Sequence, residues 1–419
     1  MTMENEMTSI PKLRFPDFEG EWKIRKSKNL FVNSRSKGNE TLPIFSVTQD
    51  KGLVPRNSLE RKMKNDAKSE DNLSVEPEDL TYNMMRMWQG AVGIAHQKCM
   101  VSPAYIVLKP TQAVSSEFFI QFFNRSRSLY LFTSYSYGLT SDRLRLYFKD
   151  FASIKFATPT LPEQQKIASF LSAIDQKLQQ FSRKKELLEQ YKKGVMQKIF
   201  SREIRFQDEN GNKYPAWQEK RLGDVLTFMS TNSLSRNDLT YESGEIKNIH
   251  YGDIHKIFKM GFDAAKEQVP YINRTTDLKK IPEEYFCQVG DVIIADASED
   301  YNDIGKAIEI WDLSGEKIVA GLHTFLGRDK TGQTTNGFKG YLLQTSLVRK
   351  QIQKSAQGIS VLGISKKNLE KVEFRLPCKK EQMKIVALLK SLDRKIETVQ
   401  TQLAQTRTFK KGLLHQLFV

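Results

Sequence analysis

The chain has 419 residues, a length that allows roughly two to four domains. Its residues are 39% hydrophobic and 27% charged, an ordinary globular composition with enough apolar residues for hydrophobic cores. Lys and Arg outnumber Asp and Glu by 65 to 49, and the net charge of +16 indicates a polyanionic partner, nucleic acid first. No apolar stretch is long enough for a membrane span or a secretory signal, and three widely spaced cysteines fit a reducing cytoplasm and exclude zinc ribbons and disulfide scaffolds.

Residues 1–158 are predicted to form a first domain of mixed α+β character. Short runs rich in β-branched and aromatic residues, bounded by turn residues, predict strands at 43–47 and 104–109. The apolar periodicity of residues 115–132 predicts an amphipathic helix.

A long helical spacer is predicted over residues 159–201. It contains no proline after its opening, and its apolar residues alternate between the a and d positions of about five heptads, a pattern that calls for a coiled-coil partner. The packing residues predicted for this helix are Ile167, Leu171, Ile174, Leu178, Phe181, Leu188 and Val195.

Residues 202–376 are predicted to form a second α+β domain, and residues 377–419 a second helical spacer. In the domain, strands are expected at 246–252, 291–297, 305–311 and 324–328, and a helix at 337–356. The packing residues predicted for the second spacer are Ile385, Leu389, Leu392, Ile396, Val399, Leu403 and Leu413.

An internal repeat relates the two halves of the chain. Residues 154–200 align without a gap to residues 372–418, with 13 of 47 positions identical. The match extends with small indels into the domains, where RFPDFEGEW (14–22) resembles RFQDENGNKYPAW (205–217). Two copies of one unit imply pseudo-twofold symmetry, and each spacer's nearest coiled-coil partner is the other spacer. The alternative is two separate helices, each packed on its own domain.

A Lys-Lys-Gly triplet occurs near the far end of both spacers, at 192–194 and 410–412. Its retention in both copies indicates either a role in docking a partner or solubilising charge at a helix end.

Basic residues mixed with aromatic, amide and hydroxyl residues are the positive signal for nucleic-acid binding, although for any single one of them a solvated surface is the better explanation. The candidates in the first domain are Lys51, Arg56, Arg61, Arg125, Arg127, Tyr135, Tyr137, Ser141 and Arg143. The candidates in the second domain are His250, Tyr251, His255, Lys256, Asn302, Lys306, His323, Ser360 and Lys366. The second domain is the less basic one, because residues 201–375 carry no net charge.

Catalytic signals are weak. His250, Asp253 and His255 lack the spacing of a helical zinc motif, and the acid-rich segment 290–310 has a counterpart at 82–98 without those acids. The chain shows no nucleophile triad, phosphate loop or methyl-donor motif. We therefore expect no catalytic, metal-binding or cofactor-binding residues.

The sequence resembles the specificity subunits of type I restriction–modification systems over essentially its whole length. The motifs that carry the resemblance are LPEQQKIASFLSAID (161–175), KKEQMKIVALLKSLD (379–393), NIHYGDIH (248–255), ASEDYNDIGKA (297–307), VAGLHTFLGR (319–328) and SVTQDKGLVPRN (46–57).

The resemblance implies two target-recognition domains and two long helices paired as an antiparallel coiled coil. It implies a non-catalytic cytoplasmic subunit that binds double-stranded DNA, two methyltransferase subunits and endonuclease-translocase subunits, with no membrane partner. S-adenosylmethionine, ATP and magnesium would then be bound by those partners, which methylate adenine and cleave DNA. Two alternatives stay open: a fused methyltransferase–nuclease, and a single-chain transcriptional regulator with two DNA-binding domains.

Overall fold

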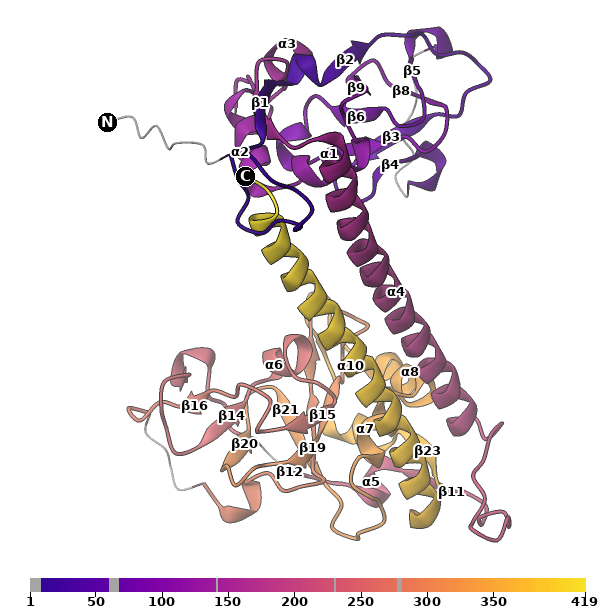
Figure 1. The fold of residues 1–419 in the computed structure, drawn as a ribbon. Helices are drawn as coiled ribbons and strands as arrows, with labels where there is room; N and C mark the ends of the chain where they lie inside the picture. Colours follow the sequence, from indigo (N-terminus) through magenta and orange to yellow (C-terminus); the bar gives the residue numbers. More distant parts are fainter. Residues whose placement is uncertain (1–8, 60–67, 141, 230, 277–280) are drawn as a thin grey trace. The chain divides into compact units, whose positions relative to one another are not determined.

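The structure, a computed structural model, describes residues 9–59, 68–140, 142–229, 231–276 and 281–419 (Figure 1). Contacts divide the chain into unit 1, residues 1–184 with 399–419, and unit 2, residues 185–398. Each unit thus joins one globular part to portions of both long helices. The predicted domain boundaries, which separate the spacers from the globular parts, remain predictions.

Unit 1 is built on an antiparallel sheet covered by phenylalanine-rich helices. The strand order is β2-β9-β6-β7, with β2 at Phe31–Ser34, β9 at Tyr105–Pro110, β6 at Leu80–Asn83 and β7 at Val92–Ile94. Helix α1 (Ser116–Phe123) packs on it, and the rings of Phe31 and Phe119 meet edge to face at 5.0 Å. Burying such aromatic surface is the main apolar contribution to this core.

The remaining elements of unit 1 are β1 (Lys23–Lys26), β10 (Lys155–Thr158), β3 (Phe45–Thr48), β4 (Gly52–Pro55), β5 (Leu73–Val75), β8 (Cys99–Val101), α2 (Ser126–Ser134) and α3 (Phe148–Phe151). The predicted strands at 43–47 and 104–109 correspond to β3 and β9. The single helix predicted over 115–132 is wrong, because the extended backbone of Arg125 separates α1 from α2.

Unit 2 repeats this sheet and adds one strand. Its order is β12-β21-β17-β19-β15, with β12 at Thr227–Met229, β21 at Thr324–Arg328, β17 at Val292–Ala295, β19 at Ala307–Asp312 and β15 at Gly261–Asp263. The first four strands pair antiparallel, as in unit 1, and β15 is parallel to β19. The predicted α+β class with an internal repeat is therefore confirmed.

The other elements of unit 2 are β11 (Gln218–Arg221), β13 (Leu239–Thr240), β14 (Lys247–Ile249), β16 (Tyr271–Ile272), β18 (Ala297–Ser298), β20 (Ile318–Ala320), β22 (Leu362–Gly363), β23 (Glu373–Leu376), α5 (Leu222–Val225), α6 (Tyr251–Lys256), α7 (Phe338–Gln344), α8 (Ser346–Ser355) and α9 (Lys366–Glu370). The predicted helix over 337–356 is divided at Thr345, whose extended backbone and hydroxyl cap α8. The strand predicted at 246–252 ends at Ile249, because α6 begins two residues later.

Helices α4 (Leu161–Phe200) and α10 (Lys379–Gln416) form the antiparallel pair expected from the heptads. In unit 1 the start of α4 packs against the end of α10, and in unit 2 the end of α4 packs against the start of α10. None of the predicted packing residues is exposed. The fully buried ones also contact the domain cores, as Leu171 does in unit 1 and Leu389 in unit 2.

A Glu-Gln dipeptide at the start of each long helix anchors the segment that precedes each domain. In unit 1 the Glu163 carboxylate is 1% exposed and accepts hydrogen bonds from Arg14 at 2.8 Å and from the Trp22 indole at 3.2 Å. In unit 2 Glu381 is fully buried and accepts from Arg205 and Trp217 in the same way. Burial of a charge requires such partners, so each dipeptide fixes the entry of the chain into its domain.

Candidate nucleic-acid interface

The turn between β14 and α6 in unit 2 places an imidazole at the start of a helix. The Nδ1 atom of His250 accepts a hydrogen bond from the Gly252 amide at 3.1 Å, and Arg236 lies 3.5 Å from the same nitrogen. Arg236 also donates two hydrogen bonds, at 2.8 and 2.9 Å, to the buried carboxylate of Asp253. Burial and then the Arg236 charge lower the pKa of His250, which favours the neutral ring.

Tyr251 lies among three imidazoles. Its ring centroid is 4.7 Å from that of His250, 6.0 Å from that of His255 and 5.3 Å from that of His323. We call these four residues the imidazole cluster. His323 is half-exposed, and its Nδ1 lies 3.2 Å from Asp296. Burial raises the pKa of Asp296, and the neighbouring His323 offsets this only in part. The cluster combines flat rings with donors and acceptors, the groups that stack on and hydrogen-bond to bases.

His255 connects the cluster to the acid-rich loop that follows β17. Its Nε2 lies 2.9 Å from the Ala297 carbonyl oxygen, and its own carbonyl accepts a hydrogen bond from Lys306 at 2.6 Å. The buried Nδ1 makes no hydrogen bond within the described residues and lies 3.9 Å from Asp303. The structure therefore brings five of the predicted residues together, since Lys306 is bound to the cluster.

Four further candidates belong to unit 2. Lys256, at the end of α6, and Asn302 are exposed. Ser360 is exposed in a hairpin that Gln357 and Gly363 close. Lys366 donates to the Phe228 carbonyl at 2.8 Å.

The candidates of unit 1 are distributed over two hairpins and α2. Lys51 is exposed between β3 and β4, while Arg56 is half-buried and donates to Ser46 at 3.1 Å. Arg127 is exposed on α2. The predicted residues Arg61 and Ser141 lie outside the described residues.

A second hairpin of unit 1 carries further candidates. Tyr137 is 64% exposed and closes this hairpin by pairing with Arg145, and Arg143 is exposed within it. Tyr135, just before it, is half-buried. This hairpin combines an aromatic ring with guanidinium groups on one accessible element, as a nucleic-acid contact requires.

Arg125 lies in the core rather than on the surface. Its guanidinium is 3.9 Å from the Phe122 ring and 4.8 Å from the Phe418 ring, and it donates to the Val419 carbonyl at 2.9 Å. Burial, and then the charge of Arg127, lowers the pKa of Arg125 to about 9. The side chain thus packs the residues that follow α10 against the domain and is not available at the surface.

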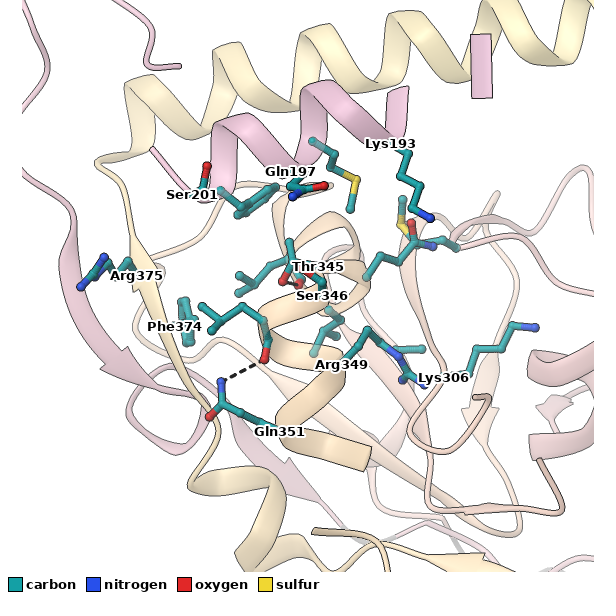
Figure 2. A pocket seen from close by; sticks show the side chains of 18 of the residues that line it. Lys193, Gln197, Ser201, Lys306, Thr345, Ser346, Arg349, Gln351, Phe374 and Arg375 are labelled. Carbon is teal, nitrogen blue, oxygen red and sulfur yellow. Dashed lines mark hydrogen bonds between the residues drawn. The ribbon is translucent and has the colours of Figure 1, made fainter. Parts of the chain in front are cut away.

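Unit 2 also contains a cleft of about 1350 Å³ that the sequence did not indicate. Figure 2 shows Lys193 and Gln197 of α4 and Ser201, which follows it, on one side, and Ser346 and Arg349 of α8 with its N-cap Thr345 on another. Lys306 borders it too, so the cleft opens beside the imidazole cluster. Its lining mixes acidic and basic residues contributed by separate segments, and no local pattern in the sequence marks such a meeting point.

Three carboxylates of segment 290–310 pair with three different basic residues. Asp291 pairs with Arg328 at 2.6 Å, Asp296 with His323, and Glu309 with Lys339 at 3.2 Å. In the part of the chain that the structure describes, no group of three or more His, Cys, Asp or Glu residues is arranged to hold a metal ion. Among the same residues, no helix is long and apolar enough to span a membrane.

A curated protein resembles this chain in sequence. The type I restriction enzyme MjaVIII specificity subunit of Methanocaldococcus jannaschii is 27% identical over 280 residues, which cover 64% of this chain and 62% of the relative. The chain thus spans about three fifths of the length of the curated relatives that it matches.

Solved structures show the same fold. The S subunit of a type I restriction–modification system from M. genitalium superposes with a TM-score of 0.56 at 16% identity, over 98% of this chain and 99% of that one. A chain from a study of complex assembly and conformational transition in the type I R-M system gives 0.55 at 14%, over 95% and 97%. The family model for the type I restriction modification DNA specificity domain matches twice, at residues 21–190 and 215–406. The chain therefore belongs to the family of type I restriction modification DNA specificity domains.

Proposed function

We propose that the chain is the non-catalytic specificity subunit of a type I restriction–modification complex. It binds a bipartite DNA target and directs adenine methylation and cleavage by partner subunits. The observation that carries the proposal is the internal repeat: both units contain the same order of four antiparallel strands and the same arginine-bound glutamate at the start of a long helix. Two related domains on one chain suit a target that consists of two separate half-sites.

In this proposal residues 1–158 and 202–376 are the target-recognition domains, and residues 159–201 and 377–419 are the spacers. The imidazole cluster with Lys306, and the exposed Asn302, Lys256 and Ser360, form the reading surface of the second domain. The exposed Lys51, Arg127, Tyr137 and Arg143 contribute to that of the first. Phosphate contacts from Lys and Arg position the duplex, and the aromatic and amide groups contact base edges.

The proposed partners are double-stranded DNA, two methyltransferase subunits and endonuclease-translocase subunits in the cytoplasm. S-adenosylmethionine, ATP and magnesium act on those partners, and this chain binds none of them. The repeat supports two equivalent docking positions for the methyltransferase subunits. Lys193 and Lys411, exposed at equivalent positions of the two long helices, are the proposed docking lysines.

The test is reconstitution with the methyltransferase subunit. We expect the purified chain alone to show neither methylation nor cleavage, and addition of the methyltransferase subunit to produce adenine methylation at one bipartite sequence. Comparing the methylated sequences of host DNA with and without the gene identifies that sequence. Methylation by the chain alone would contradict the proposal, and so would an unchanged methylation pattern after deletion of the gene.

A further inference from the structure

Each unit presents a fully exposed aliphatic side chain at the tip of an equivalent hairpin. Leu139 is 99% exposed in unit 1, and Ile359 is 102% exposed in unit 2. The repeat places both residues at the same position, directly after a glycine, in YGLT (137–140) and QGIS (357–360). Single exposed aliphatic residues are common on protein surfaces, but complete exposure at the same position of both copies is not explained by chance placement.

The hairpins hold these tips in defined positions. Tyr137 and Arg145 exchange two backbone hydrogen bonds of 3.0 and 2.8 Å, and Gln357 and Gly363 exchange two of 2.9 and 2.7 Å. A Cβ atom on Gly138 or Gly358 would overlap a carbonyl oxygen across its hairpin, so both turns require glycine. The backbone of each turn is therefore restricted at its glycine.

The hairpin of unit 2 is joined to the imidazole cluster by hydrogen bonds. Its strand β22 pairs with β18, and the Ile364 amide donates to the Asp296 carbonyl at 2.8 Å. The side chain of Asp296 holds His323. The base of the hairpin that carries Ile359 is therefore bonded to the same segment that binds His323.

The hairpin of unit 1 has the equivalent connection, since the Leu146 amide donates to the Met84 carbonyl at 2.9 Å. Its tip is flanked by the exposed Arg143 and Arg145. This combination of a basic stem and an aliphatic tip matches a DNA backbone beside a base step, with the arginines near phosphates.

We infer that Leu139 and Ile359 are wedges that insert between base pairs, one in each half-site, and distort the duplex where it is read. A stable protein interface buries about 800 Å² on each partner, far more than one aliphatic side chain offers. A wedge needs only one side chain such as Leu or Ile to unstack a base step. The inference rests on the proposed function and adds a means by which recognition depends on DNA deformability.

The test uses the full chain assembled with its methyltransferase subunits. The probe is the methylated target sequence carrying 2-aminopurine at successive positions, because this base fluoresces more strongly when unstacked. We expect the unaltered complex to raise the fluorescence at one step in each half-site. Leu139→Ala abolishes the rise in one half, Ile359→Ala abolishes it in the other, and each weakens binding by about tenfold.

Matched variants separate the wedge from general surface effects. Leu139→Ile and Ile359→Leu keep an aliphatic tip and should keep the signal. Val32→Ala and Val289→Ala remove side chains that are 57% and 54% exposed outside the hairpins and should change nothing. Unchanged fluorescence and affinity in both tip-to-alanine variants would overturn the inference, and so would loss of methyltransferase assembly without a change in DNA distortion. An unaltered complex that binds no target would overturn the proposed function itself.

Discussion

In unit 1 the Lys410 ammonium of α10 lies 2.6 and 2.8 Å from the two carboxylate oxygens of Asp175 on α4. Asp175 also accepts a hydrogen bond from Gln121 of α1 at 2.9 Å. One carboxylate thus joins both long helices to the domain. In each Lys-Lys-Gly triplet the first lysine binds a carboxylate of the other long helix, and the second lysine is exposed.

Unit 2 contains the same arrangement with the helices exchanged. Lys192 of α4 lies 2.5 Å from Asp393 of α10, which accepts a second hydrogen bond from the Tyr341 hydroxyl at 2.6 Å. Burial and the Asp393 carboxylate raise the pKa of Tyr341, so this phenol stays a donor. The repeat therefore extends to side-chain chemistry that fixes the register of the helix pair.

Removal of the Lys410 side chain should weaken the helix pair more than removal of the Lys411 side chain. We expect Lys410→Ala to lower the free energy of unfolding by about 1 kcal/mol, because the pair is only partly exposed and well aligned. Lys411→Ala, on the exposed face, is the control and should have no measurable effect. Urea unfolding of Lys410→Ala, Asp175→Ala and the double variant gives the coupling energy directly, and a coupling near zero would contradict the assigned role.

The buried anchor should be far more sensitive than an exposed ion pair. Glu381→Gln removes the charge that Arg205 and Trp217 surround, and we expect a loss of about 2–3 kcal/mol in the free energy of unfolding. Glu219→Gln is the matched control, since Glu219 pairs with Arg375 but is 79% exposed. Equal losses of unfolding free energy for the two substitutions, in thermal or chemical unfolding, would show that the buried Glu381 contributes no more stability than an exposed ion pair.

Acid should destabilise unit 2 through His250. Its folded-state pKa is lowered, so the neutral ring contributes stability above about pH 6.5, and this contribution is lost as the pH falls through the folded-state value. Protonation would remove the acceptor for Gly252 and place a charge beside Arg236, opposed only by Asp253.

The variant that tests this titration is His250→Asn, which retains a helix-capping acceptor but cannot titrate. We expect its unfolding free energy to equal that of the unaltered chain near pH 8 and to fall less between about pH 7 and pH 5. Parallel pH profiles of the two proteins in urea unfolding would refute the assignment to His250.

The sequence predicted the duplication and both long helices because a repeat and a heptad pattern are properties of the chain itself. Helices α4 and α10 lie within two or three residues of the expected ends. The contacts of Glu163 and Glu381 could not be predicted from the sequence, although both glutamates and the segments of Arg14 and Arg205 lie in the aligned repeats. Their contact joins residues about 150 or more positions apart, which no local pattern reveals.

The candidate site was predicted less completely. The imidazole cluster combines α6 and its N-cap with His323, which directly precedes β21, and only His250, Tyr251 and His255 are close in sequence. The burial of Arg125 could not be predicted beside its exposed neighbour Arg127, because the sequence does not reveal that the aromatic rings of Phe122 and Phe418 cover it. The full exposure of Leu139 and Ile359 could not be predicted either, since apolar residues ordinarily lie in the core.

We propose that one chain carries two separate target-recognition domains. The most direct measurement is the methylated sequence of host DNA in cells that carry either the unaltered gene or His323→Ala, a change confined to the second reading surface. We expect a bipartite methylated sequence in cells with the unaltered gene. In cells with His323→Ala we expect one half-site to be lost or relaxed while the other stays unchanged. A methylated sequence that is not bipartite, or that changes equally in both halves, would contradict it.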